Sequence, residues 1–477
     1  MLQNKLPACF HARILSMLLL ICFSALFNGK ANAQEPLSLT LKAAVNAGIE
    51  NHPSIQAREN YLNATEALVR NSRNEYLPNI IAAVQQNYGT INGQYGPMAP
   101  LGTLGVSSAG PASSAQNWNA AFGAAYIIGV NWEVFSFGRM RSRIRLSEGQ
   151  AGRDSADLLQ TQFIHKVKIA SAYLNLLIAG QLVESSESNL ERVRILSQSV
   201  KARTLSGLNP GVDSSLVNAE VSRAKLTLIE FVNNSETARK QLAGLLHISA
   251  AISIDPDTLF FSAIPDISDS PPSFENPQLR FYRKRVESAR QLSEVTRKSI
   301  MPGLSLFGVY QARASGFTND YNAETFSGYS TRYWDGVNPS RYNFVAGLSL
   351  SWNLMSSLKV RHQVQAQNFV AAGYQDEYNE LKLELENQLI LAQQRIRNSL
   401  QSAREAPVQF QAASAAYLQK SVLYNNGLAT IVDLQQALYT LNRAEIDKRV
   451  ANINVWHALL LKAAASGDFD LFINQAR

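Results

Sequence analysis

Cysteine is scarce in this sequence and confined to its start. Cys9 and Cys22 are the only two among 477 residues, and both lie in a segment that is predicted below to be removed. A chain without them has no disulfide, no thiol chemistry and no cysteine-ligated metal. The histidines also lack any paired ligand spacing, so neither a metal site nor a cofactor is expected. They are His11, His52, His165, His247, His362 and His457.

Long hydrophobic runs are equally rare. The run at the start, Ile14 to Phe27, follows the basic residues Lys5 and Arg13 and precedes the small-residue cleavage site Ala31-Asn32-Ala33. Because it is too short for a permanent membrane-spanning helix, it predicts an export signal over residues 1–33.

A lipoprotein signal is the alternative reading of this segment. It would use Cys22, although Ile21 stands where such signals carry a small residue. After the signal no apolar run reaches the length of a membrane-spanning helix, which argues against a helical inner-membrane protein.

An excess of one charge sign is missing once the signal is removed. Residues 1–33 carry three basic side chains and no acidic one, so the formal charge falls from +7 to +4. The one concentrated basic run is 139–145, and a nucleic-acid partner is therefore not expected. The sequence also shows no nucleophile–base constellation, phosphate loop or cofactor fingerprint, so an enzyme is not expected either.

A short motif is present twice. Gly-Leu-x-x-x-Val-Asp occurs from Gly207 to Asp213 and again from Gly427 to Asp433, between segments of helical character. Glycine favours the left-handed conformation that ends a helix, and the aspartate can cap the helix that follows. Each copy therefore predicts the tip of a helical hairpin.

Other parts of the chain are repeated as well. Pro53 to Pro78 and Pro277 to Pro302 each enclose a helix-like segment, and proline disfavours helix for the residue before it. The chain is thus predicted to divide into a signal (1–33), a first repeat (34–248), a connector (249–276), a second repeat (277–467) and a tail (468–477).

Each repeat is predicted to contain a short helix, two strands, a long helix and a return helix. In the first repeat the later elements are strands 79–88 and 120–135, helix 139–206 and helix 213–247. In the second they are strands 303–312 and 341–355, helix 358–426, which Pro407 is expected to kink or locally break, and helix 433–466. Each long helix can reach on the order of 100 Å.

The strands alternate between a bulky apolar face and a small or polar face. The apolar face includes Phe122, Tyr126, Trp132, Tyr342, Phe344 and Trp352. Such strands in an exported chain indicate an outer-membrane barrel with a polar lumen, although a soluble sandwich also alternates. Four strands cannot close a barrel, and open edges are not tolerated in hydrocarbon, so several copies are predicted to share one barrel.

At this point the sequence resembles the TolC family of outer-membrane efflux and secretion channels. The resemblance is carried by the duplicated order of elements, by Glu50-Asn51-His52-Pro53 with Leu77-Pro78, by the strand-end tryptophans Trp132 and Trp352, and by both tip motifs. It implies an α+β membrane protein of a Gram-negative outer membrane, with a 12-stranded barrel shared by a homotrimer. It also implies a periplasmic helical tunnel.

The resemblance further implies roles for residues near the tips. Asp433 is expected to face a narrow entrance, with Gln436 where some members carry a second acid. Tyr424 is expected to bond to Asp213 and hold the entrance shut, although Ala429 replaces a basic residue found in some second tips. A periplasmic adaptor and an inner-membrane pump of the RND or ABC type are the implied partners.

Two functions are compatible with the sequence. One is a passive outer-membrane conduit for drug efflux or type I secretion. The alternative is an exported coiled-coil envelope scaffold without channel activity, which should be extracted by salt or urea where a barrel needs detergent.

Overall fold

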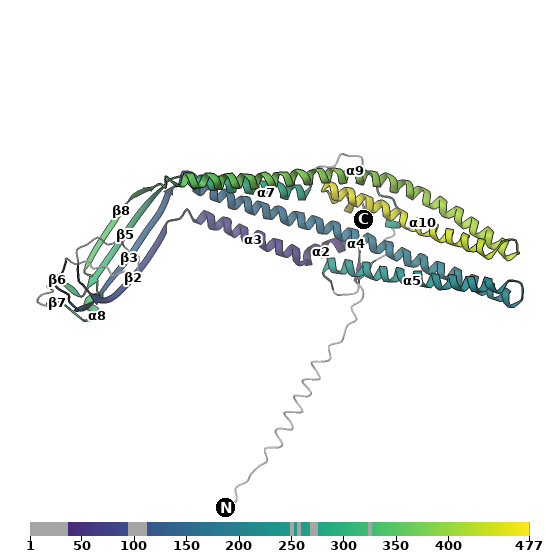
Figure 1. Ribbon diagram of the computed structural model, residues 1–477, viewed down its shortest axis with the longest axis horizontal. Helices are drawn as coiled ribbons and strands as arrows, with labels where there is room; N and C mark the ends of the chain where they lie inside the picture. The colour runs from purple at the N-terminus through teal and green to yellow at the C-terminus, as the bar shows by residue number, and fades with distance from the viewer. Residues whose placement is uncertain are drawn as a thin grey trace, which may run out of the picture.

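The computed structural model describes residues 37–93, 112–248, 252–254, 259–267, 275–322 and 327–476. The predicted signal lies outside these residues, as do half of the predicted connector (249–276) and residues 94–111 between the first two predicted strands. The described molecule is elongated, with its large sheet at one end and two helical tips at the other (Figure 1). Among the described helices, none combines the length and apolar character that a membrane crossing needs.

The elements follow the duplicated order. The first half contains β1 (Leu37–Leu39), α2 (Leu41–Asn51), α3 (Pro53–Asn74), β2 (Asn79–Thr90), β3 (Ala120–Phe135), α4 (Arg139–Leu205) and α5 (Gly211–Leu246). The linking segment contains β4 (Ile252–Ile254) and α6 (Leu259–Ser262). The second half contains α7 (Pro277–Lys298), β5 (Gly303–Ser315), β6 (Phe317–Asn322), β7 (Ser327–Tyr329), α8 (Tyr333–Val337), β8 (Arg341–Ser351), α9 (Ser356–Asn425), α10 (Ile431–Ser466) and α11 (Asp470–Ile473).

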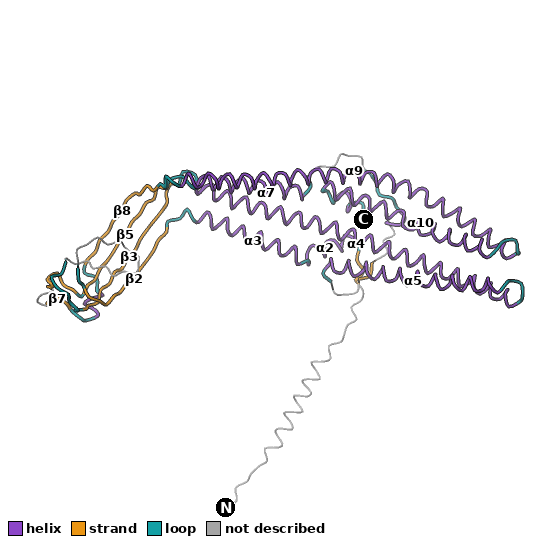
Figure 2. Tube along the Cα trace, viewed as in Figure 1, coloured by secondary structure: helices purple, strands orange, loops and turns teal. Residues whose placement is uncertain are grey.

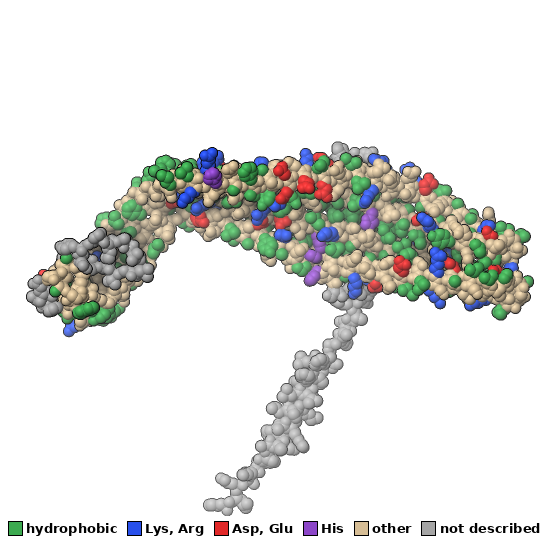
Figure 3. Space-filling view, viewed as in Figure 1, with side chains coloured by type: hydrophobic (Ala, Val, Ile, Leu, Met, Phe, Trp, Pro, Cys, Tyr) green, Lys and Arg blue, Asp and Glu red, His purple; other side chains and the backbone are tan. Residues whose placement is uncertain are grey.

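The four long strands form one antiparallel sheet in the order β2-β3-β5-β8. Directly paired residues share a face, so the register joins the alternating patterns of all four strands. One face is apolar and aromatic, with Val84, Tyr126, Tyr310, Phe344 and Leu348 among its members. Figure 2 shows that the sheet is set apart from the helices, and Figure 3 shows charged side chains spread along the helices and few over the strands.

Two tryptophans tie the sheet to the helices in the same way. The indole N–H of Trp132 donates to the carbonyl of Tyr76 (2.7 Å), and that of Trp352 donates to the carbonyl of Ile300 (3.0 Å). Each bond joins the end of one strand to the turn that precedes a neighbouring strand. The duplication is thus preserved in the contacts as well as in the order of elements.

The last strand ends earlier than the predicted residue 355. β8 stops at Ser351, because the chain turns at Asn353, whose carbonyl accepts from the hydroxyl of Ser356 (2.6 Å). Trp352 therefore lies just beyond the strand. An alternating pattern cannot reveal this turn, since Trp352 and Leu354 continue the alternation.

Pro407 does not break α9, which runs without interruption through it. Ala403 and Ala406, just before the proline, are 6% exposed and pack against Ala451 and Val455 of α10. The packing of the two helices outweighs the one backbone hydrogen bond that proline cannot make. The predicted local break is therefore wrong.

The short helix α8 covers the outer end of the apolar face. The hydroxyl of Tyr126 donates to the carbonyl of Val337 (2.9 Å), and the ring of Phe122 meets that of Tyr333 edge-on at 5.2 Å. Phe122 and Tyr126 are therefore partly covered by the chain itself, whereas Phe344 is 84% exposed.

The main hydrophobic core lies midway along the helices. It joins α2, α4, α5, α6, α10 and α11 around Tyr173, Phe260 and Trp456, all of which are less than 2% exposed. The indole N–H of Trp456 donates to the carbonyl of Ala263 (3.1 Å). This core fixes the return helices against the long ones and so sets the position of the tips.

A pair of histidines lies at the junction of α2 and α3. His52 caps α3, since its Nδ1 accepts from the N–H of Ser54 (3.3 Å), and its ring lies 4.1 Å from that of buried His165. His165 Nε2 donates to the carbonyl of Leu245 (3.0 Å). Burial first, then the neighbouring His52 and the positive charge of Lys168, lower the pKa of His165.

This pair predicts a loss of stability in acid. A folded-state pKa below the ordinary value of about 6.5 means that the unfolded chain binds the proton more readily. Stability present at neutral pH is then lost as the pH falls through the ordinary value toward the lowered one. We expect the apparent unfolding temperature of the detergent-solubilised protein to fall over this range, and His165→Gln to reduce the fall. His362→Gln, at an exposed position, is the control; an equal effect of both variants would contradict the prediction.

Candidate functional site at the helix tips

The two helical hairpins end in turns of the same geometry. Gly207 and Gly427 have φ values of +72° and +75°. In each turn the N–H of the residue after the glycine donates to a carbonyl in the last turn of the preceding helix, at 2.9 and 2.8 Å. Glycine adopts this left-handed conformation without steric cost, so both motif glycines are required by the backbone.

The aspartates of the two motifs are not the N-caps that the sequence suggested. α10 begins at Ile431, and its N-cap is Thr430, whose hydroxyl oxygen accepts from the N–H of Asp433 (3.2 Å). The Asp433 carboxylate in turn accepts from the N–H of Thr430 (3.1 Å), which completes a capping box. In the first tip the N-cap is Pro210, which has no side-chain acceptor, and Asp213 accepts instead from the amide of Asn209 (3.0 Å).

Asp433 remains partly exposed and charged. The hydrogen bonds from Thr430, the backbone one first, and then the positive charge of Lys420 lower the pKa of the Asp433 carboxyl. The Lys420 ammonium lies 3.7 Å from it. Gln436 follows one turn later on α10 and is exposed. A neutral amide there leaves Asp433 as the acidic group of this turn.

A set of polar contacts joins the two tips, and we call its members Arg203, Asn209, Tyr424 and Asn425 the tip clasp. The Arg203 guanidinium donates to the side-chain oxygen of Asn209 (3.1 Å) and to the carbonyl of Asn425 (2.8 Å). It also lies over the ring of Tyr424, 5.7 Å from the centroid. The Asn209 amide donates to the Tyr424 hydroxyl (2.6 Å).

Tyr424 is held in a small apolar core between the hairpins. It is 4% exposed and packs with Val200, Val217, Ile431 and Leu434. Burial first, and then the negative charge of Asp213, raise the pKa of its hydroxyl. The hydroxyl is therefore neutral near neutral pH and available as a hydrogen-bonding group.

The predicted bond between Tyr424 and Asp213 takes a different form. The Asn209 amide stands between them and donates to both. Which side chain reaches Tyr424 depends on how the first tip packs against the second hairpin. The link between the tips is thus a bridge through Asn209 rather than a direct contact.

The sequence did not single out Arg203, Asn209 or Asn425. One signal could have found them: at the offset that relates Gly207 to Gly427, their counterparts are Leu423, Ala429 and Leu205, all apolar. The contacts between the two hairpins use positions that are not equivalent in the two copies. Positions where the two copies differ in polarity are therefore the natural candidates for contacts between them.

A second set of polar contacts joins the hairpins farther from the tips. We call it the seam network, and its members are Gln181, Glu184 and Arg192 of α4 with Glu445 and Arg449 of α10. Glu445 is 8% exposed and accepts from Arg192 (2.7 Å) and Arg449 (3.2 Å). Arg449 also reaches Glu184 (2.9 Å) and Gln181 (3.2 Å). Both the seam network and the tip clasp therefore fasten one hairpin to the other.

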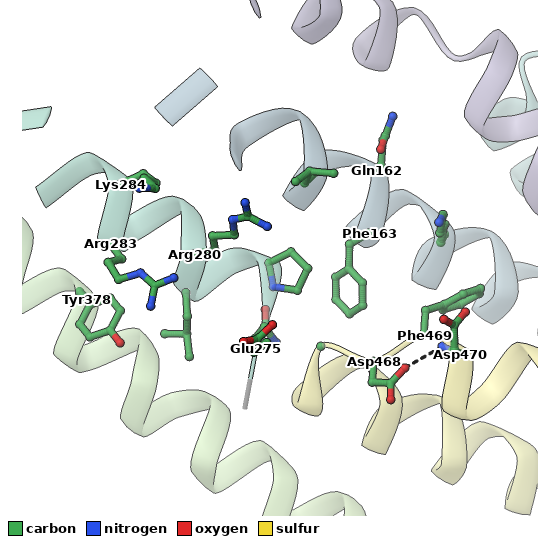
Figure 4. Close-up of a pocket in the computed structure, with 16 residues that line it drawn as sticks. Gln162, Phe163, Glu275, Arg280, Arg283, Lys284, Tyr378, Asp468, Phe469 and Asp470 are labelled. Carbon is green, nitrogen blue, oxygen red and sulfur yellow. Dashed lines mark hydrogen bonds between the residues drawn. The ribbon is translucent and has the colours of Figure 1, made fainter. Parts of the chain in front are cut away.

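A cavity of about 650 Å³ lies away from the tips, where the end of α10 meets the start of α7. Figure 4 shows basic side chains, among them Arg280 and Arg283, and the acidic Asp468 and Asp470 around it. Asn276 joins the two helices here, since its amide donates to the carbonyls of Ala464 (3.2 Å) and Ala465 (3.1 Å). The mixed charges and these contacts mark it as a joint between helices.

Known proteins share this architecture. Residues 44–246 and 274–455 match the model of the family described as outer membrane efflux protein. Among solved structures, VceC of Vibrio cholerae is similar with 15% identity over 90% of this chain and 96% of its own, at a TM-score of 0.70. The Campylobacter jejuni CmeC outer membrane channel shares 12% identity over 90% and 85%, at 0.71. The open state of the Neisseria gonorrhoeae MtrE outer membrane channel shares 15% over 90% and 89%, at 0.69.

No curated protein sequence matches significantly. The family model matches most of both predicted repeats, and the solved structures share the fold over 90% of the chain. Together they confirm the predicted fold class, the resemblance stated from the sequence and the outer-membrane location. The chain belongs to the outer membrane efflux protein family.

Proposed function

We propose that three copies of this chain form a passive outer-membrane conduit for a tripartite efflux or type I secretion system. The observation that carries the proposal is the sheet. Its outermost strands β2 and β8 each have a free edge within the described chain, and its apolar face is exposed, with Val84 at 68% and Phe344 at 84%. A sheet of this kind is stable in hydrocarbon only when other copies complete the barrel.

In this arrangement the apolar face meets lipid and the polar face lines the lumen. The predicted outer-face residues Tyr342, Phe344, Trp132 and Trp352 would lie against the membrane, and the tryptophans at the sheet–helix junction suit its interface. Phe122 and Tyr126 would be shielded in part by α8. The long helices would then continue the barrel as a tunnel in the periplasm.

The tips would form the periplasmic entrance. The tip clasp would hold the two hairpins of each copy together in the closed state, with Asp213 joined through Asn209 to Tyr424. Asp433 would contribute a carboxylate to the entrance of each copy. A periplasmic adaptor, tied to an inner-membrane pump that supplies the energy, would dock at the tips and release the clasp.

Measurement of the mass of the detergent-extracted protein by light scattering, corrected for bound detergent, tests this proposal. We expect three protomers, since three sheets of four strands close one barrel. Extraction by urea alone is the control for peripheral attachment. A monomer, or release without detergent, would instead support an envelope scaffold and remove the channel.

A further inference from the structure

The four long strands carry three charged side chains, and all of them lie on the polar face. They are Glu133, Arg313 and Arg341. The register places Arg313 directly opposite Arg341, and Glu133 directly opposite Ser305, which is on the same face. Glu133 stands at the helix end of the sheet, and the two arginines stand at the far end.

The charge at the helix end is neutralised. Glu133 accepts from the guanidinium of Arg139 at 2.5 Å. Gly303 makes room for the pair, since a Cβ there would lie 3.1 Å from the Glu133 carboxylate and 3.2 Å from the Arg139 guanidinium. At this end of the polar face the charge of Glu133 is therefore neutralised by an ion pair.

The two arginines at the far end have no such partner in the described part of the chain. Both are exposed, and no carboxylate there lies within 4.0 Å of either guanidinium. Arg341 donates to the carbonyl of Ser340 (3.1 Å). Like charges directly opposite each other destabilise a sheet unless an anion screens them.

We propose that Arg313 and Arg341 form an anion-binding ring at the outer mouth of the channel. The proposal rests on the trimeric barrel proposed above, in which three such pairs face one aqueous lumen. Guanidinium groups bind phosphate, sulfate and carboxylate oxygens through paired N–H donors, and rings of arginine favour anions in pores. The ligands would be small multivalent anions and the anionic groups of passing cargo.

Side-specific block of single channels tests this ring. Inorganic tripolyphosphate would be added on the extracellular side of trimers in planar bilayers, in the Arg203→Ala background if the unmodified channel stays closed. We expect concentration-dependent block that is about tenfold weaker or more in R313Q/R341Q, and that fades at about 1 M salt because the Debye length falls to about 3 Å. Block from the periplasmic side should not change with this double substitution.

Arg332→Gln is the matched control. Arg332 is exposed and precedes α8, which packs on the apolar face, so its loss should leave the block unchanged. If R313Q/R341Q conducts normally and tripolyphosphate blocks it as strongly as the parent, the proposed anion-binding ring is wrong and the proposed channel stands. A protein that forms no trimer and passes no current would overturn the proposed function itself.

Discussion

Arg203→Ala should convert a closed channel into a leaking one. The substitution removes both hydrogen bonds that the guanidinium makes and its contact with the ring of Tyr424. Hydrogen bonds from a charged group contribute about 1.5–3 kcal/mol, so a loss of about 2 kcal/mol would raise the open-to-closed ratio about 30-fold in each protomer. We expect higher conductance in planar bilayers and greater sensitivity of cells to large antibiotics.

Two further variants sharpen this test. Tyr424→Phe should leak less than Arg203→Ala, because Asn209 would still connect Asp213 to Arg203. Arg194→Ala is the control, since Arg194 is an exposed side chain on the same helix whose carboxylate partner is Glu191, three residues earlier. Conductance of Arg203→Ala no higher than that of Arg194→Ala would show that the clasp does not hold the entrance closed.

Glu445→Ala should loosen the hairpins above the tips and destabilise the fold. Glu445 is buried and accepts from both Arg192 and Arg449. Its removal leaves these two positive charges without the carboxylate that they share. Loss of one member of a buried ion pair typically costs about 3–5 kcal/mol. We expect a marked fall in the apparent unfolding temperature of the trimer, together with increased leak.

The seam network offers its own controls. Glu191→Ala removes an exposed carboxylate from α4 and should change neither quantity. Replacing Arg192, Glu445 and Arg449 together by apolar residues of similar size should recover much of the stability, because the one carboxylate that loses its partner, Glu184, is exposed and no buried charge is left unpaired. If Glu445→Ala behaves like Glu191→Ala, the network does not fasten the hairpins.

Much of the architecture followed from local sequence patterns. The strand alternation, the prolines and the two tip motifs predicted the elements, because each pattern reports a local backbone preference. The ends of helices and strands were predicted less well where a single side-chain contact sets them. β8 ends at a turn around Asn353 that the alternation hides, and α10 takes Thr430 as its cap in place of Asp433.

The site itself was only partly predictable. Tyr424, Asp213 and the two motif glycines lie at the tips as expected, but Arg203 and Asn209, which join the tips, were missed. Their partners lie more than 200 residues away in the sequence. A basic residue inside an amphipathic helix is usually a solvated surface residue, and nothing local distinguishes Arg203 from its neighbours.

By itself the sequence determined the duplicated order of elements, the apolar and polar faces of each strand, and the need for other copies to complete the sheet. These depend on residue spacing and on the solvent each face requires. Only the tertiary structure decided which side chains cross from one hairpin to the other, that packing carries α9 through Pro407, and that Arg313 lies opposite Arg341. Such contacts depend on the register between segments far apart in the chain, and periodicity within one segment carries no information about that register.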